Sequence, residues 1–462
     1  MKLGIKAVLA VTTVLAGTSM ASAETLKEAL AAAYASNPQL MAQRAALRAI
    51  DEGVAAANAG FLPTVNGGIT LQRGAQTFDT SASPTGSVSD QDIDDDSYTV
   101  TVQQNLFRGF QDRSIRKQRL RESEAGRAQL TNVEQQVLLN AVTAYMNVLR
   151  DEAVVELNNN NIQVLERQLQ ASRDRFRVGE VTRTDVAQSE ARLEGAKSTL
   201  LSAEATLAAS RALYQRVIGR PPATLETPAE GPELPSTLDD AVEIAVAESP
   251  NVRQARLNEE AARYSVNQAK GNLLPSVDLT YQRLHNEGIT AFGPNVFPAV
   301  FDRSRVSVQL TVPIFNGGQR HSGVRRAKQL RSQRMMEIYQ AERVAQEQAL
   351  VAWDNYRAAK GQILSNEAQV RANEIALEGV RQEAYVGSRT TLDVLNAEQE
   401  LLNARVSLVR AQRDEAVAAY SLVSAVGRLT ARDIGLGIEL YDETAYLEKV
   451  DGKFIGFDTK VD

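Results

Sequence analysis

Hydrophobic and polar positions alternate along this chain with two different periods. Over long stretches apolar residues recur every three or four positions, which is the spacing of an amphipathic helix. From Gln111 to Val178 this spacing is sustained, and no proline lies between Pro84 and Pro221 or after Pro313. A helix of about 68 residues, at 1.5 Å per residue, would be about 100 Å long. The pattern therefore predicts an unusually long helix.

Four shorter stretches alternate with period two instead. Their length of about ten residues and their single apolar face are typical of transmembrane β-strands, although a soluble hairpin against a core would show the same pattern. The intervening segments favour the membrane interpretation, because Thr77–Ser97 and His285–Asp302 are predicted to be long polar loops. The apolar positions of the four stretches are Ile69 and Leu71; Tyr98, Val100 and Val102; Val277, Leu279 and Tyr281; and Val306, Val308, Leu310 and Val312.

The chain contains an internal repeat, which is the first feature to seek in a long sequence. Leu62-Pro63 matches Leu274-Pro275 at an offset of 212, and from Phe107 and Phe315 onward the offset is 208. Each copy is predicted to hold a helix (25–59 and 238–271), a β-hairpin, a long helix and a return helix. The predicted organisation is a signal peptide at 1–23, a first repeat at 24–220, a linker at 221–236, a second repeat at 237–430 and a tail at 431–462.

Two matching points in the repeats reverse the chain. Gly179 and Gly387 interrupt the helical pattern, and Thr182 and Thr390 follow at the same spacing. A glycine ends a helix readily, and a threonine is a common N-cap of the next one. The sequence therefore predicts two antiparallel helical hairpins whose tips lie at 177–190 and 385–398.

Composition narrows the class of protein. The basic start at Lys2 and Lys6, an apolar run and Ala21-Ser22-Ala23 predict a secretory signal peptide. The chain has no cysteine and a net charge of −6, which argues against disulfides and against nucleic acid as a partner. His285 and His321 are isolated, so no metal site is expected. No nucleophile elbow, phosphate loop or paired-carboxylate cleft is visible, and neither enzymatic activity nor a cofactor is predicted.

Four strands are too few for a membrane barrel, because such barrels need at least about eight. An open sheet edge in lipid would leave backbone groups unpaired, at several kcal/mol each. Several chains must therefore share one barrel. The residues alone allow two, three or four chains.

The mature chain resembles the TolC family of outer-membrane channel-tunnels. The resemblance is carried by the duplicated order of elements, Leu-Pro before each first strand, Phe-x-Gly after each second strand, and the paired tips. It implies an internally duplicated α+β membrane protein with four transmembrane β-strands and long coiled-coil helices per chain. Three chains would form a twelve-stranded β-barrel on a periplasmic α-helical barrel, with the tail at mid-height of the tunnel.

The resemblance also implies a function and partners. The homotrimer would be a passive exit duct in the outer membrane of a Gram-negative bacterium, in contact with outer-membrane lipid. A periplasmic adaptor (membrane fusion) protein and an inner-membrane ABC or RND-type pump would open it for type I secretion or multidrug efflux. An alternative from another class is a periplasmic coiled-coil scaffold without a pore, which would not need the strand pattern.

Carried onto this chain, the resemblance implies a periplasmic gate at the tips. Arg389 would pair with Thr184 and Asp185 of a neighbouring hairpin, and Asp393 would line an acidic ring that favours cations. The position three residues on often holds a further acid, but here it is Asn396. The alternative is that the charged members of this set only cap helix ends, where acids suit the N-terminus.

Two further groups of residues are singled out. The groove between the tips is the expected adaptor contact, and its residues are Val178, Gly179, Thr182, Val386, Gly387 and Thr390. Phe107 and Phe315 are predicted to lie at the inner ends of their strands, where aromatic residues collect at membrane interfaces. Ordinary packing at a strand-to-helix junction is the alternative for these two rings.

Overall fold

The computed structural model describes residues 23–79, 81–82, 86, 88–229, 231–292 and 295–459. The predicted signal peptide lies outside the described residues, apart from Ala23. The chain forms two compact units. One is built from residues up to Ser36, Asn140–Pro232 and Ala359–Val417, and the other from Asn37–Leu139, Glu233–Ala358 and the residues from Ala418 onward.

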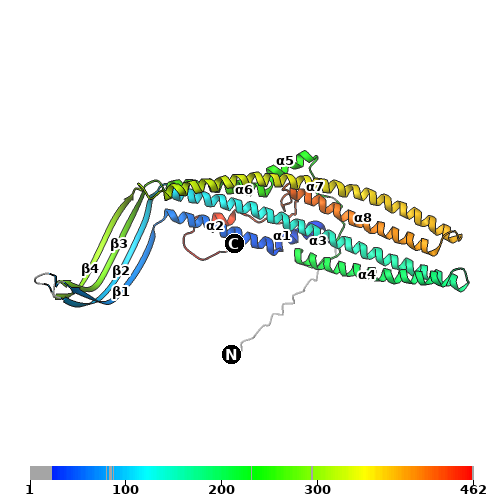
Figure 1. Cartoon of the computed structure of the whole chain (residues 1–462), viewed down its shortest axis with the longest axis horizontal. Coiled ribbons are helices and arrows are strands. Elements are labelled where there is room, and N and C mark those ends of the chain that lie inside the picture. The colour runs from blue at the N-terminus through cyan, green and yellow to red at the C-terminus, as the bar shows by residue number, and fades with distance from the viewer. Residues whose placement is uncertain are drawn as a thin grey trace, which may run out of the picture. The chain divides into compact units, whose positions relative to one another are not determined.

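The second unit contains a single antiparallel sheet whose strands lie side by side in chain order (Figure 1). This order pairs the hairpin of the first repeat directly with that of the second, through β2 and β3. The outer sides of β1 and β4 pair with no described strand, so a single chain has two open sheet edges. The strands are β1 (Thr64–Asp79), β2 (Val88–Arg108), β3 (Ser276–Phe292) and β4 (Asn295–Thr311).

The strands are longer than the sequence predicts, and the prediction of two long polar loops is wrong. β2 begins at Val88, inside the first predicted loop, and the ladder of β3 and β4 continues to Phe292↔Asn295. The reason is that ladder hydrogen bonds join backbone groups, which every non-proline residue carries. Polar residues beyond the apolar positions can therefore extend a hairpin, although the side-chain pattern no longer marks a strand there.

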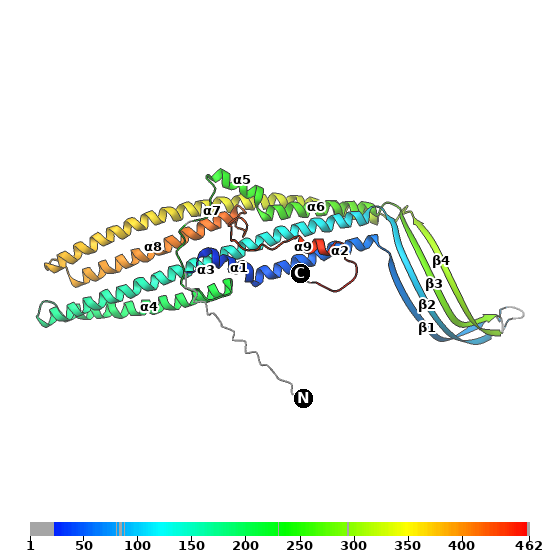
Figure 2. The same ribbon diagram turned by 180° about the vertical axis from the view of Figure 1, so that it is seen from behind.

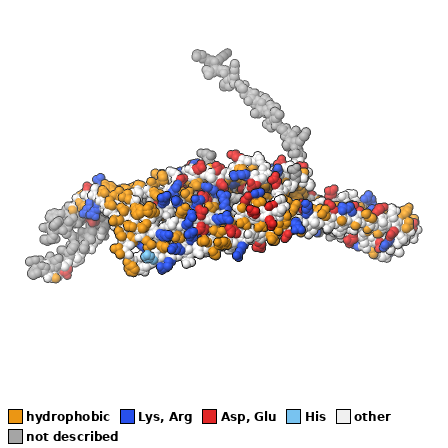
Figure 3. All heavy atoms as spheres, turned by 90° about the horizontal axis from the view of Figure 1, so that it is seen from above, with side chains coloured by type: hydrophobic (Ala, Val, Ile, Leu, Met, Phe, Trp, Pro, Cys, Tyr) orange, Lys and Arg blue, Asp and Glu red, His pale blue; other side chains and the backbone are white. Residues whose placement is uncertain are grey.

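The register shows that the sheet has one apolar and one polar face. Val65, Val102, Tyr281 and Val306 lie opposite one another across all four strands. Directly opposed residues share a face, so the apolar alternation of the four strands forms one continuous band. Its side chains are exposed in the single chain, Val306 by 68%. Figure 3 shows hydrophobic side chains gathered over the described part of the sheet, whereas hydrophobic and charged side chains are interspersed farther along the helices.

Each predicted opening helix is broken in two, which corrects the expectation of one helix at 25–59 and one at 238–271. The break falls before Pro38 in the first repeat and before Pro250 in the second. The residue before a proline is disfavoured in the helical region, and proline itself suits the first turn of a helix. The resulting helices are α1 (Leu26–Ser36), α2 (Pro38–Asn58), α5 (Leu238–Glu248) and α6 (Pro250–Gly271), and a short 3₁₀ turn, η1 (Ala59–Phe61), follows α2.

The prediction of very long helices is confirmed. α3 (Gln111–Arg177) and α7 (Gln319–Tyr385) each have 67 residues. They turn back into α4 (Arg183–Ile218) and α8 (Thr391–Ala425), and each pair forms a helical hairpin whose tip lies in the first unit (Figure 2). No helix of the described chain has both the length and the apolar composition that crossing a bilayer requires.

Small side chains allow close helix packing in the second unit. Ala241 and Ala245 of α5 and Ala349 of α7 are fully buried in one cluster with Leu422 and Val426. The C-terminal segment also belongs to this unit. There α9 (Ala445–Val450) is held to α2, because the Tyr446 hydroxyl donates to Glu52 at 2.6 Å.

The start of the described chain is held in the first unit by contacts of Glu24. Glu24 forms a parallel bridge with Leu225, so the beginning of the first repeat lies beside the predicted linker. The Tyr145 hydroxyl lies 2.7 Å from the carbonyl oxygen of Glu24 and 2.6 Å from that of Glu226. Arg220 adds an ion pair to the Glu24 carboxylate at 2.7 Å.

The junction between β2 and α3 depends on a close approach of two backbones. Gly109 has a φ of +57°, and a Cβ there would lie 2.3 Å from the carbonyl oxygen of Gly271. Gly317, at the matching position of the second repeat, has a φ of +66° but no atom within 4 Å of its Cβ position. The two glycines therefore share a left-handed conformation and differ in the space around them.

We predict that Gly109→Ala destabilises the protein more than Gly317→Ala. Both changes carry the strain of a left-handed residue, about 1–2 kcal/mol. Only Gly109→Ala also places a methyl group against a backbone carbonyl, which cannot move aside as a flexible side chain can. Thermal unfolding of the two purified variants measures the difference. An equal loss at both positions would contradict the close approach.

Candidate functional site

Both tips turn by the same backbone motif. Gly179 and Gly387 each have a φ of +80°, a conformation that favours glycine. At each tip, the N–H groups of the glycine and of the residue after it donate to carbonyl oxygens of the last helical turn, as in a Schellman motif. The bonds run from Gly179 to Phe176 (3.0 Å), Glu180 to Arg175 (2.9 Å), Gly387 to Ala384 (3.2 Å) and Ser388 to Glu383 (2.9 Å).

Each return helix begins with a reciprocal cap. The Asp185 N–H donates to the Thr182 hydroxyl oxygen at 3.3 Å, and the Thr182 N–H donates to the Asp185 carboxylate at 2.8 Å. Thr390 and Asp393 repeat the arrangement at 3.3 and 3.0 Å. Such pairs satisfy backbone donors that a helix start leaves free. The two predicted aperture acids are thus both engaged in caps within their own chain.

These caps favour the ionised form of both acids. The Thr182 hydroxyl and N–H lower the pKa of Asp185, and the Thr390 N–H and hydroxyl lower that of Asp393. A lowered pKa means that the cap contributes fully to stability above the usual carboxyl pKa and loses this contribution as the pH falls through the lowered value. At neutral pH both groups carry a negative charge at the tips.

Arg389 has a partner that sequence reasoning did not foresee. Its Nε donates to the Glu383 carboxylate at 2.8 Å, within the same tip, and this bond raises the pKa of Arg389. The predicted partners, Thr184 and Asp185, belong to a neighbouring hairpin, and Arg389 makes its ion pair in the chain with Glu383 instead. The cross-hairpin contact stays a prediction.

The two hairpins are joined near their tips by contacts that sequence reasoning missed. Leu395 of α8 is fully buried in a cluster with Leu165 and Leu169 of α3 and Leu193 of α4. Beside it, Arg192 donates to the Asn396 side-chain oxygen at 2.8 Å. Asn396 therefore serves as an acceptor between the repeats, where an acid was expected in relatives.

The aligned repeats already show a difference at the residue that joins the hairpins. Leu395 corresponds to Ala187 at the offset of 208, so only the second tip carries a large apolar side chain at this point. A large residue in one copy and a small one in the other is what a contact between the copies requires. Arg192 corresponds to Glu400, and its pairing gave no such signal.

The residues of the predicted adaptor contact form an open surface on the single chain. Val178 is exposed by 72% and Val386 by 76%. A Cβ at Gly179 or Gly387 would meet no atom within 4 Å. Thr182 and Thr390, in contrast, are already used as caps. The tips thus present exposed valines beside glycines, where another backbone could approach closely.

The two predicted interface aromatics lie in different surroundings. Phe107 lies near the end of β2 and contacts Phe110 edge to face, with ring centroids 5.1 Å apart. Phe315 follows the end of β4 at Thr311 and is exposed by 85%. The interpretation as membrane-interface residues stays a prediction for both, and packing at a junction describes Phe107 alone.

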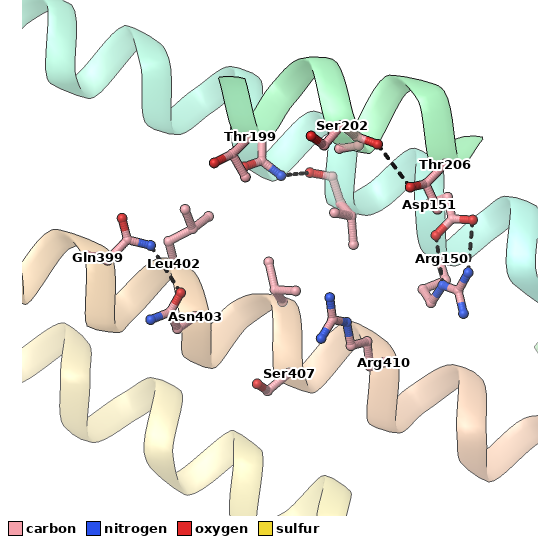
Figure 4. Close-up of a pocket in the computed structure, with 14 residues that line it drawn as sticks. Arg150, Asp151, Thr199, Ser202, Thr206, Gln399, Leu402, Asn403, Ser407 and Arg410 are labelled. Carbon is pink, nitrogen blue, oxygen red and sulfur yellow. Dashed lines mark hydrogen bonds and ion pairs between the residues drawn. The ribbon is translucent and has the colours of Figure 1, made fainter. Parts of the chain in front are cut away.

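A groove of about 640 Å³ lies between the first hairpin and α8 (Figure 4). Arg150 and Asp151 form a two-bonded ion pair on one wall, at 2.8 and 2.9 Å, and Ser210 donates to the same carboxylate at 2.5 Å. Asn158 is buried in this wall and donates to the Val154 carbonyl at 2.7 Å. The lining combines hydroxyl, amide and guanidinium groups with apolar side chains, those of Val154, Ala203, Leu402 and Val406.

Among the described residues, no cluster of three or more His, Cys, Asp or Glu side chains could hold a metal ion. The molecule instead consists of an apolar-faced sheet with open edges and two capped helical hairpins.

A model of the outer membrane efflux protein family matches residues 29–220 and 241–428, most of both repeats. The chain belongs to the outer membrane efflux protein family.

Individual relatives agree with this assignment. The chain is 34% identical over 455 residues to the outer membrane efflux protein BepC of Brucella suis, covering 98% of this chain and 96% of that one. It is 25% identical over 438 residues to the outer membrane protein TolC of Escherichia coli, covering 90% and 85%. The resemblance to the TolC family is thereby confirmed.

Solved structures show the same fold. The outer membrane protein VceC of Vibrio cholerae superimposes with a TM-score of 0.72 over 87% of this chain and 96% of its own, at 21% identity. Family membership makes the chain an outer-membrane protein of the exit-duct type used in secretion and efflux. A periplasmic scaffold without a pore does not fit this family.

We predict that Leu395→Ala loosens the contact between the hairpins. Truncating a buried leucine costs about 2–5 kcal/mol. Leu392, on the same helix, is 38% exposed, and Leu392→Ala serves as the matched control. Limited proteolysis of the tips measures the effect, with faster cleavage expected for Leu395→Ala only. Equal cleavage of both variants would show that the leucine cluster does not hold the hairpins together.

Proposed function

We propose that three chains form a passive exit duct, with one twelve-stranded barrel in the outer membrane and their helices spanning the periplasm. An adaptor protein and an inner-membrane ABC or RND-type pump would open it. The observation that carries the proposal is the sheet itself. Its apolar face is exposed in the single chain, and both of its edges lack a partner among the described strands.

Pairing of several copies would cover the open edges of the sheet and direct its apolar face to lipid. If β4 of one copy pairs with β1 of the next, every backbone donor and acceptor in the membrane gains a partner, and the sheet closes with its apolar face toward lipid. Two, three or four copies would give eight, twelve or sixteen strands, all of which membrane barrels allow. We choose three copies because the resemblance to the TolC family implies a trimer.

The gate at the tips is part of the proposal. Three chains would bring six tips around one aperture, with Asp185 and Asp393 supplying ionised carboxylates and Arg389 the counter-charge. Thr184 and Asn396 complete the set. The caps support this arrangement because they fix the position of each acid at its helix start. The Arg192–Asn396 bond adds a link that couples the two hairpins of one chain.

We predict that Arg389→Ala raises the single-channel conductance of the purified protein in planar bilayers. The arginine would otherwise hold a neighbouring hairpin in the closed arrangement, and its loss lets the tips separate. A rise in conductance by at least a few-fold is expected if the tips are the narrowest point of the duct.

Glu383→Gln is the matched control, because it removes the partner of Arg389 within its own tip. If Arg389 acts between hairpins, Glu383→Gln leaves the conductance low while Arg389→Ala raises it. The same rise in both variants would show that the bond within the tip is what matters. An unchanged conductance in Arg389→Ala would count against a gate at this residue.

We predict that a cysteine at Gly387 crosslinks to a cysteine-bearing adaptor tip in cells. The residue is exposed, and nothing in the chain blocks access to it. Gly361→Cys is the control, because Gly361 is equally open but lies on α7, 24 residues before the helix ends at Tyr385, about 36 Å along the helix. An adduct at Gly387 alone is expected. No adduct at Gly387, or adducts at both positions, would refute the tip as the docking point.

A further inference from the structure

The polar face of the sheet carries two arginines that have no acidic partner among the described residues. Arg303 and Arg305 lie two residues apart on β4, so both side chains are on the same face. Arg305 lies opposite Gln282, which lies opposite Thr101, so this is the face away from the apolar band. Both side chains are exposed, and no described carboxylate lies within 4.0 Å of either.

Their neighbours do not neutralise them. Arg303 lies opposite Leu284, and its guanidinium lies over the ring of Phe301, 5.6 Å from the centroid. The acids on the polar face lie elsewhere: Asp278 is opposite Gln309, two side-chain rows from Arg305, and Asp95 is on β2, opposite Gln72. Arg108, also on this face, is paired with Asp112 at 3.1 Å.

Closing the barrel would not supply a partner either. In the proposed assembly the strand beside β4 is β1 of the next copy. The described polar-face side chains of β1 are all uncharged, namely Thr64, Asn66, Thr70 and Gln72, with glycines at 68 and 74. The two arginines would therefore stay unpaired in the assembled sheet, and three copies would place six guanidinium groups on the inner wall.

We propose that Arg303 and Arg305 form a basic ring inside the barrel that favours the passage of anions. The proposal rests on the closed barrel of the proposed function. A ring of like charges in a narrow, water-filled passage raises the local concentration of counter-ions and lowers that of co-ions. Small anions and carboxylate-rich parts of an exported molecule would be the favoured class, whereas the tips carry acids.

The test is the ion selectivity of the purified protein in planar bilayers under a potassium chloride gradient. Replacing both arginines, Arg303→Gln with Arg305→Gln, is expected to lower the chloride-to-potassium permeability ratio by about twofold or more. The double lysine variant, Arg303→Lys with Arg305→Lys, keeps the charge and should keep the wild-type ratio. The difference between wild type and the glutamine variant should shrink at about 1 M salt, because screening is then short-ranged.

Arg283→Gln is the matched control. Arg283 lies on the neighbouring strand but opposite Val100, on the apolar face, so the same change of charge should leave the ratio unaltered. A conducting double glutamine variant with an unchanged ratio would overturn the proposal, and so would an equal shift in Arg283→Gln. If the double variant does not insert, Arg305→Gln alone gives the same reading. A wild-type protein that forms no channel would instead contradict the proposed function.

Discussion

Backbone hydrogen bonding within a membrane is the constraint on which this structure depends. The sheet of one chain satisfies the inner strands, β2 and β3, and leaves one side of β1 and of β4 without a described partner. Lipid offers no donors or acceptors, so such edges are costly unless another chain covers them. Lipid can cover the exposed apolar face, so this face suits a sheet that lies in the membrane, whereas the edges need another chain. In the proposed assembly, oligomerisation answers the two open edges of a sheet of only four strands, and the closed wall is what an exit duct requires.

Duplication explains how one chain supplies so much of that wall. Each repeat contributes one hairpin to the sheet and one long helical hairpin. The copies have since diverged where they meet. Leu395 fills a cluster against the first hairpin, while the aligned residue is Ala187, and Asn396 accepts a bond from Arg192. The matching tips thus share turns and caps and differ in the residues that join them, as a contact between unlike copies requires.

Much of the fold could be predicted from the sequence because its elements are long and periodic. The long helices, the duplicated tips and the apolar face of the strands were all visible. Prediction from the local pattern failed at the opening helices and at the strand ends. Pro38 and Pro250 broke helices that apolar spacing had suggested were continuous, and polar strand ends paired although they lacked the alternation. The bonds of Arg389 to Glu383 and of Arg192 to Asn396 depend on side-chain conformation and on packing between distant segments, which periodicity does not encode.

The most direct test of the central claim is the number of chains in one particle extracted from the outer membrane in mild detergent, measured by native mass spectrometry. Three copies per particle are expected, because three four-stranded sheets close one barrel. Circular dichroism should show that the particle retains its β-structure. A stable particle of one chain, or a protein recovered only from the soluble periplasmic fraction, would contradict the account.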